Sequence, residues 1–284
     1  MIKLAIPNKG RLKPDILRLL EKIGLEIPEN GRKLYANTNN PNILIVYARA
    51  SDIPLYVQSG AADLGISGED MINESMVDVK KLLALNFGTC KIALAAPKDS
   101  NIKSVSDCSD GIKVATKLAN ISEKYFADKG IKCKIVKVDG ATELAPYLGI
   151  ADVIVDQVST GTTLTQNNLV VIDNIMESKS CLIVNNDSFQ KKQEEVTEIA
   201  LSIESVITAE EKRYIMANVP DKQTLDSVVS VMPAMDSPTV LSLANGGFSI
   251  HSVVDSQNLI STMGKIKKAG AKDILVMNVS RVVT

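Results

Sequence analysis

One stretch of the chain combines a carboxylate with a cluster of hydroxyl groups. Asp156 follows an apolar run that we predict to be a buried strand, Asp152–Val155, and a helix is expected to begin near Thr162. The loop between them consists of Ser159, Thr160, Gly161, Thr162 and Thr163. Backbone N–H groups at the glycine, the hydroxyls and a helix N-terminus suit a phosphate, and the carboxylate suits a sugar hydroxyl or a magnesium ion. The same residues also make an ordinary capped turn between a strand and a helix.

Cationic side chains follow two other predicted strands. Lys9 and Arg11 come after the strand Ile2–Ile6, and Arg49 comes after Asn42–Tyr47. Ligands of α/β proteins gather at the carboxyl ends of the strands, so these residues indicate a place for anionic groups. A solvated basic turn explains the first loop, taken alone, about equally well.

Asp70 opens a predicted helix directly after a third strand, Ala62–Ser67. An acidic residue in the first turn complements the helix dipole and needs no further role. Its carboxylate could also accept a hydrogen bond from an amino or hydroxyl group of a ligand.

Strand–helix units that alternate in two blocks must position these residues. Residues 170–185 are expected to form two strands, the second of which carries the chain back to the first block, and this indicates two α/β lobes around a cleft. From Tyr214 the order of elements is βαββαβ, the ferredoxin-like pattern, with a hairpin at Asn245-Gly246-Gly247. We predict lobe I from residues 1–90 and 180–208, lobe II from 91–179, and a regulatory domain from 211–284.

Composition limits the classes of function. The 284 residues include 32 basic and 33 acidic side chains, so the sequence has no excess of positive charge that would indicate binding to nucleic acid or to an anionic membrane. No apolar run reaches the length of a membrane span, and the N-terminal apolar segment is too short for a signal peptide, so a cytoplasmic location is expected. The four scattered cysteines form no CxxC pair and are interpreted as reduced thiols. The single histidine, His251, makes a catalytic triad or a histidine-rich metal site improbable.

Several longer segments, in order, resemble one enzyme family. They are PNKGRL, RASDIPLYVQSGAADLGISGEDMINE, LALNFGTCKIALAAP, VDGATELAPYLGIADVIVDQVSTGTTL, MDSPTVLSLA and AGAKDILV. Their ordered set is similar to the ATP phosphoribosyltransferases of histidine biosynthesis, in the long form. The resemblance implies an α/β fold of two lobes of the type II periplasmic-binding-protein kind, with a C-terminal ferredoxin-like (ACT-like) βαββαβ domain.

The resemblance also implies a reaction. A phosphoribosyl group passes from phosphoribosyl pyrophosphate to N1 of the ATP adenine, pyrophosphate leaves, and Mg2+ is required. Adenine N1 carries a free lone pair, so the chemistry needs charge management and alignment, not a base at that atom. The implied catalytic residues are Lys9, Arg11, Arg49 and Asp156. Phosphoribosyl pyrophosphate would bind Asp156, Ser159, Thr160, Gly161, Thr162 and Thr163, and ATP would bind Gly10, Arg11, Leu12, Arg49 and Asp70.

The tail is expected to bind histidine as a feedback inhibitor, around Asp236, Ser237, Thr239 and Ala271. An amino acid needs a carboxylate for its ammonium group, which Asp236 would supply, although Asp236-Ser237 also reads as a turn cap. Dimers that assemble into hexamers are implied, and AMP is a further candidate regulator. Two alternatives stay open at this point: a non-enzymatic two-lobed binding protein for a small anion with a sensing tail, and a phosphoribosyltransferase that uses another base.

Overall fold

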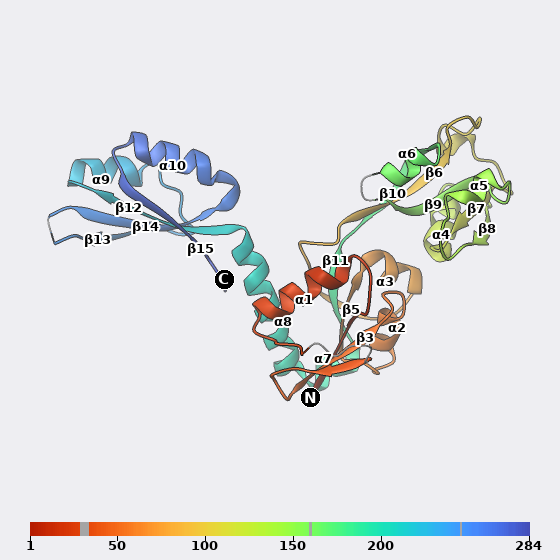
Figure 1. Cartoon of the computed structure of the whole chain (residues 1–284), viewed down its shortest axis with the longest axis horizontal. Coiled ribbons are helices and arrows are strands. Elements are labelled where there is room, and N and C mark those ends of the chain that lie inside the picture. Colours follow the sequence, from red (N-terminus) through yellow and green to blue (C-terminus); the bar gives the residue numbers. More distant parts are fainter. Residues whose placement is uncertain (29–33, 159–160, 245) are drawn as a thin grey trace. The chain divides into compact units, whose positions relative to one another are not determined.

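The computed structural model describes residues 1–28, 34–158, 161–244 and 246–284. The described chain forms two compact units, Met1–Ala200 and Leu201–Thr284. Two sheets make up the larger unit and one sheet makes up the smaller unit (Figure 1).

The first sheet contains the N-terminal strands of the chain. In spatial order its strands are β2 (Tyr35–Asn37), β3 (Ile43–Ala48), β1 (Ile2–Pro7), β4 (Leu64–Gly68), β11 (Ser180–Val184) and β5 (Lys80–Ala84). Its helices are α1 (Leu12–Lys22), α2 (Ile53–Gln58), α3 (Glu69–Ser75) and α7 (Asn186–Lys191), and α8 (Gln193–Glu210) continues the chain beyond them. The central strands are almost continuous apolar runs because both of their faces are buried, as at Leu4, Ile45 and Leu64.

The second sheet holds the middle of the chain. In spatial order its strands are β10 (Leu169–Ser178), β6 (Cys90–Pro97), β9 (Val153–Val158), β7 (Lys113–Thr116) and β8 (Lys134–Lys137). Its helices are the short 3-10 turn η1 (Val105–Asp107), α4 (Ala119–Asp128), α5 (Leu144–Tyr147) and α6 (Thr162–Gln166). Phe126 of α4 is fully buried in the core that this sheet supports.

Both sheets share one topology. In each, three parallel strands lie in the order second, first, third: β3-β1-β4 in one and β8-β7-β9 in the other. An antiparallel strand follows, β11 or β6, and it is the strand by which the chain enters that sheet from the other sheet. This exchange of strands is typical of type II periplasmic binding proteins, so the predicted fold class is confirmed for these two lobes.

Two predicted elements differ from the structure. The strand expected to stop at Val155 continues as β9 to Val158, because Asp156 and the two residues after it pair with antiparallel β6 beyond the point where β7 ends. Asp156 therefore lies inside a strand and not at the start of a loop. Apolar side chains recur with helical spacing over residues 191–208 and predict one long helix from Lys191 to Thr208; the structure forms it as α8 from Gln193, and Lys191 ends the separate helix α7.

The smaller unit has the predicted ferredoxin-like order of elements. Its strands lie in the spatial order β13 (Thr239–Ser242), β14 (Phe248–Asp255), β12 (Lys212–Val219) and β15 (Lys272–Asn278), all antiparallel. Helices α9 (Lys222–Val229) and α10 (Leu259–Lys268), the latter preceded by the turn η2 (Ser256–Asn258), cover one face of this sheet (Figure 1). Asp221 caps the N-terminus of α9, since its side chain accepts a 2.8 Å hydrogen bond from the Thr224 N–H.

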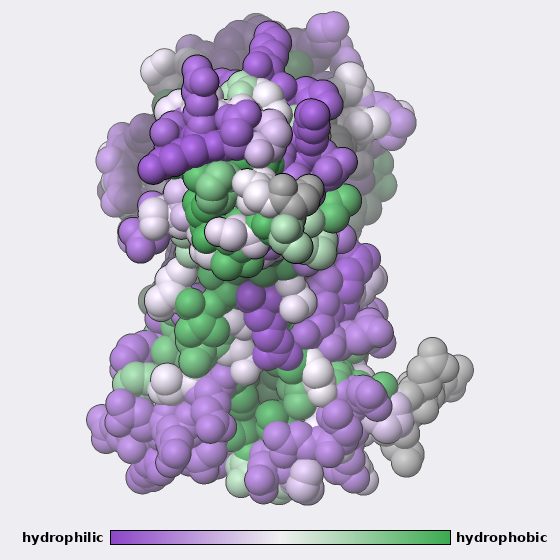
Figure 2. Space-filling view, turned by 90° about the vertical axis from the view of Figure 1, so that its left-hand side faces the viewer, coloured by the Kyte–Doolittle hydropathy of each residue, from purple (hydrophilic) through white to green (hydrophobic). Residues whose placement is uncertain are grey.

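Both edge strands of the smaller unit carry exposed apolar side chains. Val240 and Leu241 lie on β13, and Leu275 and Met277 lie on β15. Figure 2 looks onto the end of this unit where the β13–β14 hairpin lies and shows apolar residues gathered around the hairpin. Exposed apolar edge strands are sites at which a sheet can pair with another chain. Among the described residues, no helix has both the length and the apolar character needed to cross a bilayer.

Asp63, just before β4, ties the start of the first sheet to α7 and α8. Its carboxylate accepts hydrogen bonds from Lys192 Nζ at 2.8 Å, Ser188 Oγ at 2.6 Å and the Lys3 N–H at 2.8 Å. Burial alone would raise the pKa of Asp63, but these three donors outweigh it and hold the pKa below its usual value. The lowered pKa means that this carboxylate stabilises the fold above its unfolded-state pKa and loses that contribution as the pH falls through the folded-state pKa.

Asp63→Asn is therefore expected to reduce the free energy of unfolding at pH 7 by about 1–3 kcal/mol, the cost of losing hydrogen bonds to a buried charge. Urea denaturation at pH 7 and at pH 3 measures this, and the difference between variant and parent should shrink at the lower pH. Asp187→Asn is the matched control, because its ion pair with Lys191 is exposed and should contribute less than about 0.5 kcal/mol. A penalty that is equal at both pH values would contradict this role for the charge.

Candidate active site

A cavity of about 560 Å³ in the larger unit collects the loops that follow β1, β3 and β4. All three loops lie at the carboxyl ends of parallel strands, where ligand sites of α/β folds form. The cavity wall includes every residue that the sequence assigned to ATP: Gly10, Arg11, Leu12, Arg49 and Asp70, together with Lys9. The structure thus brings these residues together from three separate segments of the sequence, around Lys9, Arg49 and Asp70.

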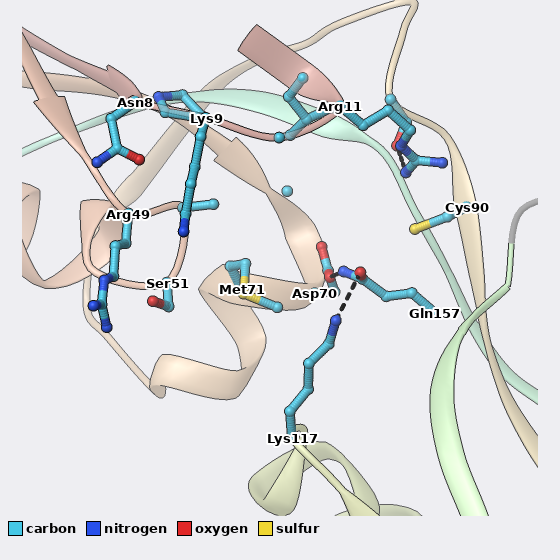
Figure 3. Close-up of a pocket in the computed structure, with 16 residues that line it drawn as sticks. Asn8, Lys9, Arg11, Arg49, Ser51, Asp70, Met71, Cys90, Lys117 and Gln157 are labelled. Atoms are coloured by element: carbon cyan, nitrogen blue, oxygen red, sulfur yellow. Dashed lines mark hydrogen bonds between the residues drawn. The ribbon is translucent and has the colours of Figure 1, made fainter. Parts of the chain in front are cut away.

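The loop after β1 is shaped by backbone contacts. The Asn8 N–H donates to the Ala48 carbonyl at 2.8 Å, which ties the loop to the end of β3. Gly10 has a φ of +94°, a conformation that side chains other than glycine rarely adopt, and it turns the chain into α1. Lys9 and Arg49 extend along one side of the cavity, and Arg11 points to the other side (Figure 3).

Gly88 forms the wall against which Arg11 rests. The Arg11 guanidinium donates to the Gly88 carbonyl at 3.4 Å. A Cβ atom at Gly88, whose φ is +75°, would lie 2.3 Å from Ser180 Oγ and 2.4 Å from Leu12 Cδ2. The positive φ and these close neighbours favour glycine here, and the Gly88 carbonyl lies beside Arg11 as a hydrogen-bond acceptor.

Asp70 is held rigidly in the first turn of α3. Its side chain is buried, with a relative exposure of 2%. Its Oδ1 accepts a hydrogen bond from Ser178 Oγ at 2.7 Å, and its Oδ2 accepts one from the Gln157 side-chain amide (Figure 3). The carboxylate is therefore fixed in orientation, and a donor group of a ligand can take the place of the Gln157 amide.

A second cavity, of about 340 Å³, adjoins the first. Asp156, Gly161 and Thr163, three of the residues assigned to phosphoribosyl pyrophosphate, line it. Gly161 has a φ of +76° and precedes α6, of which Thr162 is the first residue. Ser159 and Thr160 lie outside the described residues.

Sequence reasoning missed several polar residues that line these cavities, and three of them lie in or beside the smaller one. Lys117 follows β7 and lies with its ammonium nitrogen 3.7 Å from Asp156 Oδ1. Gln157 comes next to Asp156 in β9, and Glu143 precedes α5. The signal for Lys117 was available, because it is a cation directly after a strand, as Lys9 is. Gln157 could be found only from the extension of β9.

Cys90 is the one cysteine on the wall of the larger cavity. Burial raises the pKa of its thiol, the nearby Asp70 carboxylate adds to this, and Arg11 offsets part of it. The group therefore stays protonated near neutral pH and does not supply a thiolate nucleophile. All four cysteines are free thiols, as expected.

The residues proposed for histidine do not all meet within one copy of the smaller unit. Asp236, Ser237 and Thr239 lie before or at the start of β13, at one edge of the sheet, and Ala271 precedes β15 at the opposite edge. Three strand spacings separate these edges, which is about 14 Å. His251 lies on β14, where its Nδ1 is 2.7 Å from Tyr214 Oη, as an ordinary strand residue would.

Comparison with known proteins agrees with this geometry. The family model described as ATP phosphoribosyltransferase matches residues 49–205, and the model of the HisG C-terminal domain matches 209–281. The "ATP phosphoribosyltransferase" of Methanococcoides burtonii is 44% identical over 286 residues, which is 100% of both chains, and that of Methanocaldococcus jannaschii is 43% identical over 99% of this chain and 100% of its own. The chain belongs to the ATP phosphoribosyltransferase family.

A solved structure of a related protein has a similar fold. The "ATP phosphoribosyl transferase (HisG:HisZ) complex from Thermotoga maritima" contains a chain that is 32% identical, with a TM-score of 0.64 over 72% of this chain and 96% of that chain. The predicted membership of the ATP phosphoribosyltransferase family is thereby confirmed. The prediction that the protein is an enzyme is confirmed as well: it is a transferase that catalyses the first step of histidine biosynthesis. The C-terminal match fits the long form of the family.

Proposed function

We propose that the larger cavity binds ATP and the smaller cavity binds phosphoribosyl pyrophosphate. The convergence of Lys9, Arg11 and Arg49 from two strand ends on one cavity, next to a second cavity that contains Asp156, carries this proposal. Two adjoining sites are what a reaction between two anionic substrates requires, since proximity and orientation supply a large part of the rate enhancement.

Each residue has a role in this arrangement. Lys9, Arg11 and Arg49 offset the charges of the ATP phosphates and of the leaving pyrophosphate, and Gly10 and Leu12 shape the loop beside them. Asp70 accepts a hydrogen bond from the adenine amine or the ATP ribose. Asp156 holds the hydroxyls of the transferred ribose. Donors of the segment Ser159–Thr163 bind its 5-phosphate.

Magnesium fits the donors of the smaller cavity. Asp156 and Glu143 supply carboxylate oxygens there, and Mg2+ in proteins is usually held by one or two carboxylates together with substrate phosphates and water. When bound, the ion would neutralise charge on the diphosphate. The protein's own residues align the two substrates around it.

The functional division of the chain follows the sheets. We infer catalytic lobes from residues 1–90 with 180–208 and from 91–179, and a regulatory domain from 211–284. Histidine would bind near Asp236, Ser237 and Thr239 as an inhibitor, with AMP as a further regulator. A site that also uses Ala271 needs two copies of the domain, each of which supplies one edge, in keeping with a homo-oligomer such as a dimer or hexamer. We also propose that the protein is located in the cytoplasm.

Asp236→Asn is expected to raise the histidine concentration for half-inhibition at least tenfold, because the ammonium group loses its charged partner and a charge-assisted hydrogen bond contributes about 1.5–3 kcal/mol. Activity without histidine should stay unchanged. Inhibition curves of parent and variant measure this, with Asp226→Asn on α9 as the control. An unchanged half-inhibition value would remove Asp236 from the effector site.

The proposed activity has a direct assay. The protein is incubated with ATP, phosphoribosyl pyrophosphate and Mg2+, and formation of N1-substituted adenine is followed by absorbance together with release of pyrophosphate. Both signals should appear at the same rate and only when both substrates are present. No product with ATP, but product with another nucleobase, would indicate a different phosphoribosyltransferase. Tight binding without any product would indicate a binding protein.

A further inference from the structure

Lys117 lies where the two cavities of the larger unit meet. Among the described residues, it and Gln157 are the two that line both cavities. Its ammonium nitrogen is 3.7 Å from Asp156 Oδ1 and donates a 3.1 Å hydrogen bond to Gln157 Oε1 (Figure 3). Gln157 in turn donates to Asp70. The lysine therefore connects the carboxylate proposed for the ribose with the carboxylate proposed for ATP.

The charges of the smaller cavity make this position significant. Among the described residues that line it, Lys117 is the only basic one, and Asp156 and Glu143 are acidic. Phosphoribosyl pyrophosphate carries a 5-phosphate at one end and a diphosphate at the anomeric carbon. The Gly161 segment suits the 5-phosphate, so among the described residues of this cavity Lys117 is the cation that can join the arginines and the metal ion in offsetting the diphosphate charge, since unpaired charges are costly to desolvate.

The reaction places the diphosphate close to this junction. Adenine N1 must reach the anomeric carbon, so that carbon lies where the ATP cavity opens into the second cavity. The diphosphate is bonded to the same carbon through one oxygen. The flexible four-carbon stem of Lys117, whose side chain is 35% exposed, allows its ammonium to move from Asp156 to the diphosphate.

We propose that Lys117 is a further substrate-binding residue, which pairs with the diphosphate of phosphoribosyl pyrophosphate and stabilises pyrophosphate as it leaves. This role rests on the proposed function. In the step, the N1 lone pair forms the N1–C1 bond, the C1–O bond breaks, and its electron pair stays on the pyrophosphate oxygen. Lys117 holds the charge that develops there, while Asp156, released from the lysine, accepts hydrogen bonds from the ribose hydroxyls. A proton from the adenine amine leaves to solvent.

Lys117→Met tests this role in the full-length protein. We expect the KM for phosphoribosyl pyrophosphate to rise at least tenfold and kcat to fall at least tenfold, while the Kd for ATP changes less than twofold. Calorimetric titration with inorganic pyrophosphate in the absence of Mg2+, so that a metal ion on Asp156 does not contribute, should show at least tenfold weaker binding. Lys117→Arg should restore most of both losses. Lys124→Met, on an exposed position of α4 that lines neither cavity, should behave as the parent.

A second variant separates direct binding from a merely structural ion pair. If Lys117 only held Asp156 in place, Asp156→Asn would weaken pyrophosphate binding as much as Lys117→Met does, and this result would overturn the proposal. The proposal predicts that Asp156→Asn leaves pyrophosphate affinity within twofold of the parent. If the parent forms product and Lys117→Met has the same kinetics as the parent, the role of Lys117 is overturned, and the proposed function still stands. A parent that forms no product would instead overturn the proposed function.

Discussion

Asp156→Ala is expected to lower kcat/KM for phosphoribosyl pyrophosphate by about 10²–10⁴-fold. The carboxylate faces the smaller cavity, and we propose that it accepts two hydrogen bonds from the ribose hydroxyls. Hydrogen bonds to a charged group contribute about 1.5–3 kcal/mol each, and every 1.4 kcal/mol corresponds to a factor of ten. The loss should appear in the KM for phosphoribosyl pyrophosphate and in kcat, and hardly in the Kd for ATP.

The fold should tolerate this change. Asp156 is partly exposed, and its ion pair with Lys117 spans 3.7 Å, so its removal should cost no more than about 1 kcal/mol of stability. Steady-state kinetics with each substrate varied, together with thermal denaturation, measure both quantities. Asp128→Ala, an exposed position on α4, is the control. Parental kinetics in the Asp156 variant would remove this residue from the site.

Arg49→Ala is expected to lower kcat by about 10²–10³-fold. Loss of one preorganised donor that stabilises developing charge typically costs about 3–4 kcal/mol of transition-state stabilisation. Arg49 is exposed on the cavity wall, and its guanidinium has no ion-pair or hydrogen-bond partner among the described residues. Its removal therefore leaves no buried group unpaired, and the melting temperature should not change.

The conservative change refines this prediction. Arg49→Lys keeps the charge but loses the planar pair of donors, so it should recover only part of the rate if a phosphate is bound in a bidentate manner. Single-turnover measurements with saturating ATP separate chemistry from binding. Arg18→Ala, on an exposed ion pair of α1, is the matched control. A parental kcat in Arg49→Ala would place the phosphates elsewhere.

Most of the strands and helices that position the site could be predicted from the sequence. Strands such as β1 and β3 are short apolar runs because they are buried, and a cation or an acid after each marks the carboxyl end. The edge strand β2 and the strand β5, which begins Lys80-Lys81, were not predicted, because their polar and partly exposed residues lack a strong pattern.

Contacts between distant segments could not be predicted in this way. Asp70 was recognised as a helix acid, but its partner Ser178 is 108 positions away, and only the folded sheets bring the two together. Similarly, Glu74 of α3 accepts hydrogen bonds from the N–H groups of Asn120 and Ile121 and so caps α4, which has no side-chain cap of its own. Such pairings depend on how the lobes pack and leave no local signature.

The central claim is that two substrates occupy two adjoining cavities, and a crystal structure with ATP and an unreactive analogue of phosphoribosyl pyrophosphate tests it most directly. The account predicts the adenine and phosphates of ATP among Lys9, Arg11, Arg49 and Asp70. It predicts the 5-phosphate of the analogue at the Gly161 segment, with its ribose hydroxyls on Asp156. Electron density for the phosphoribosyl group between Lys9 and Arg49, with ATP bound at the Gly161 segment, would contradict it.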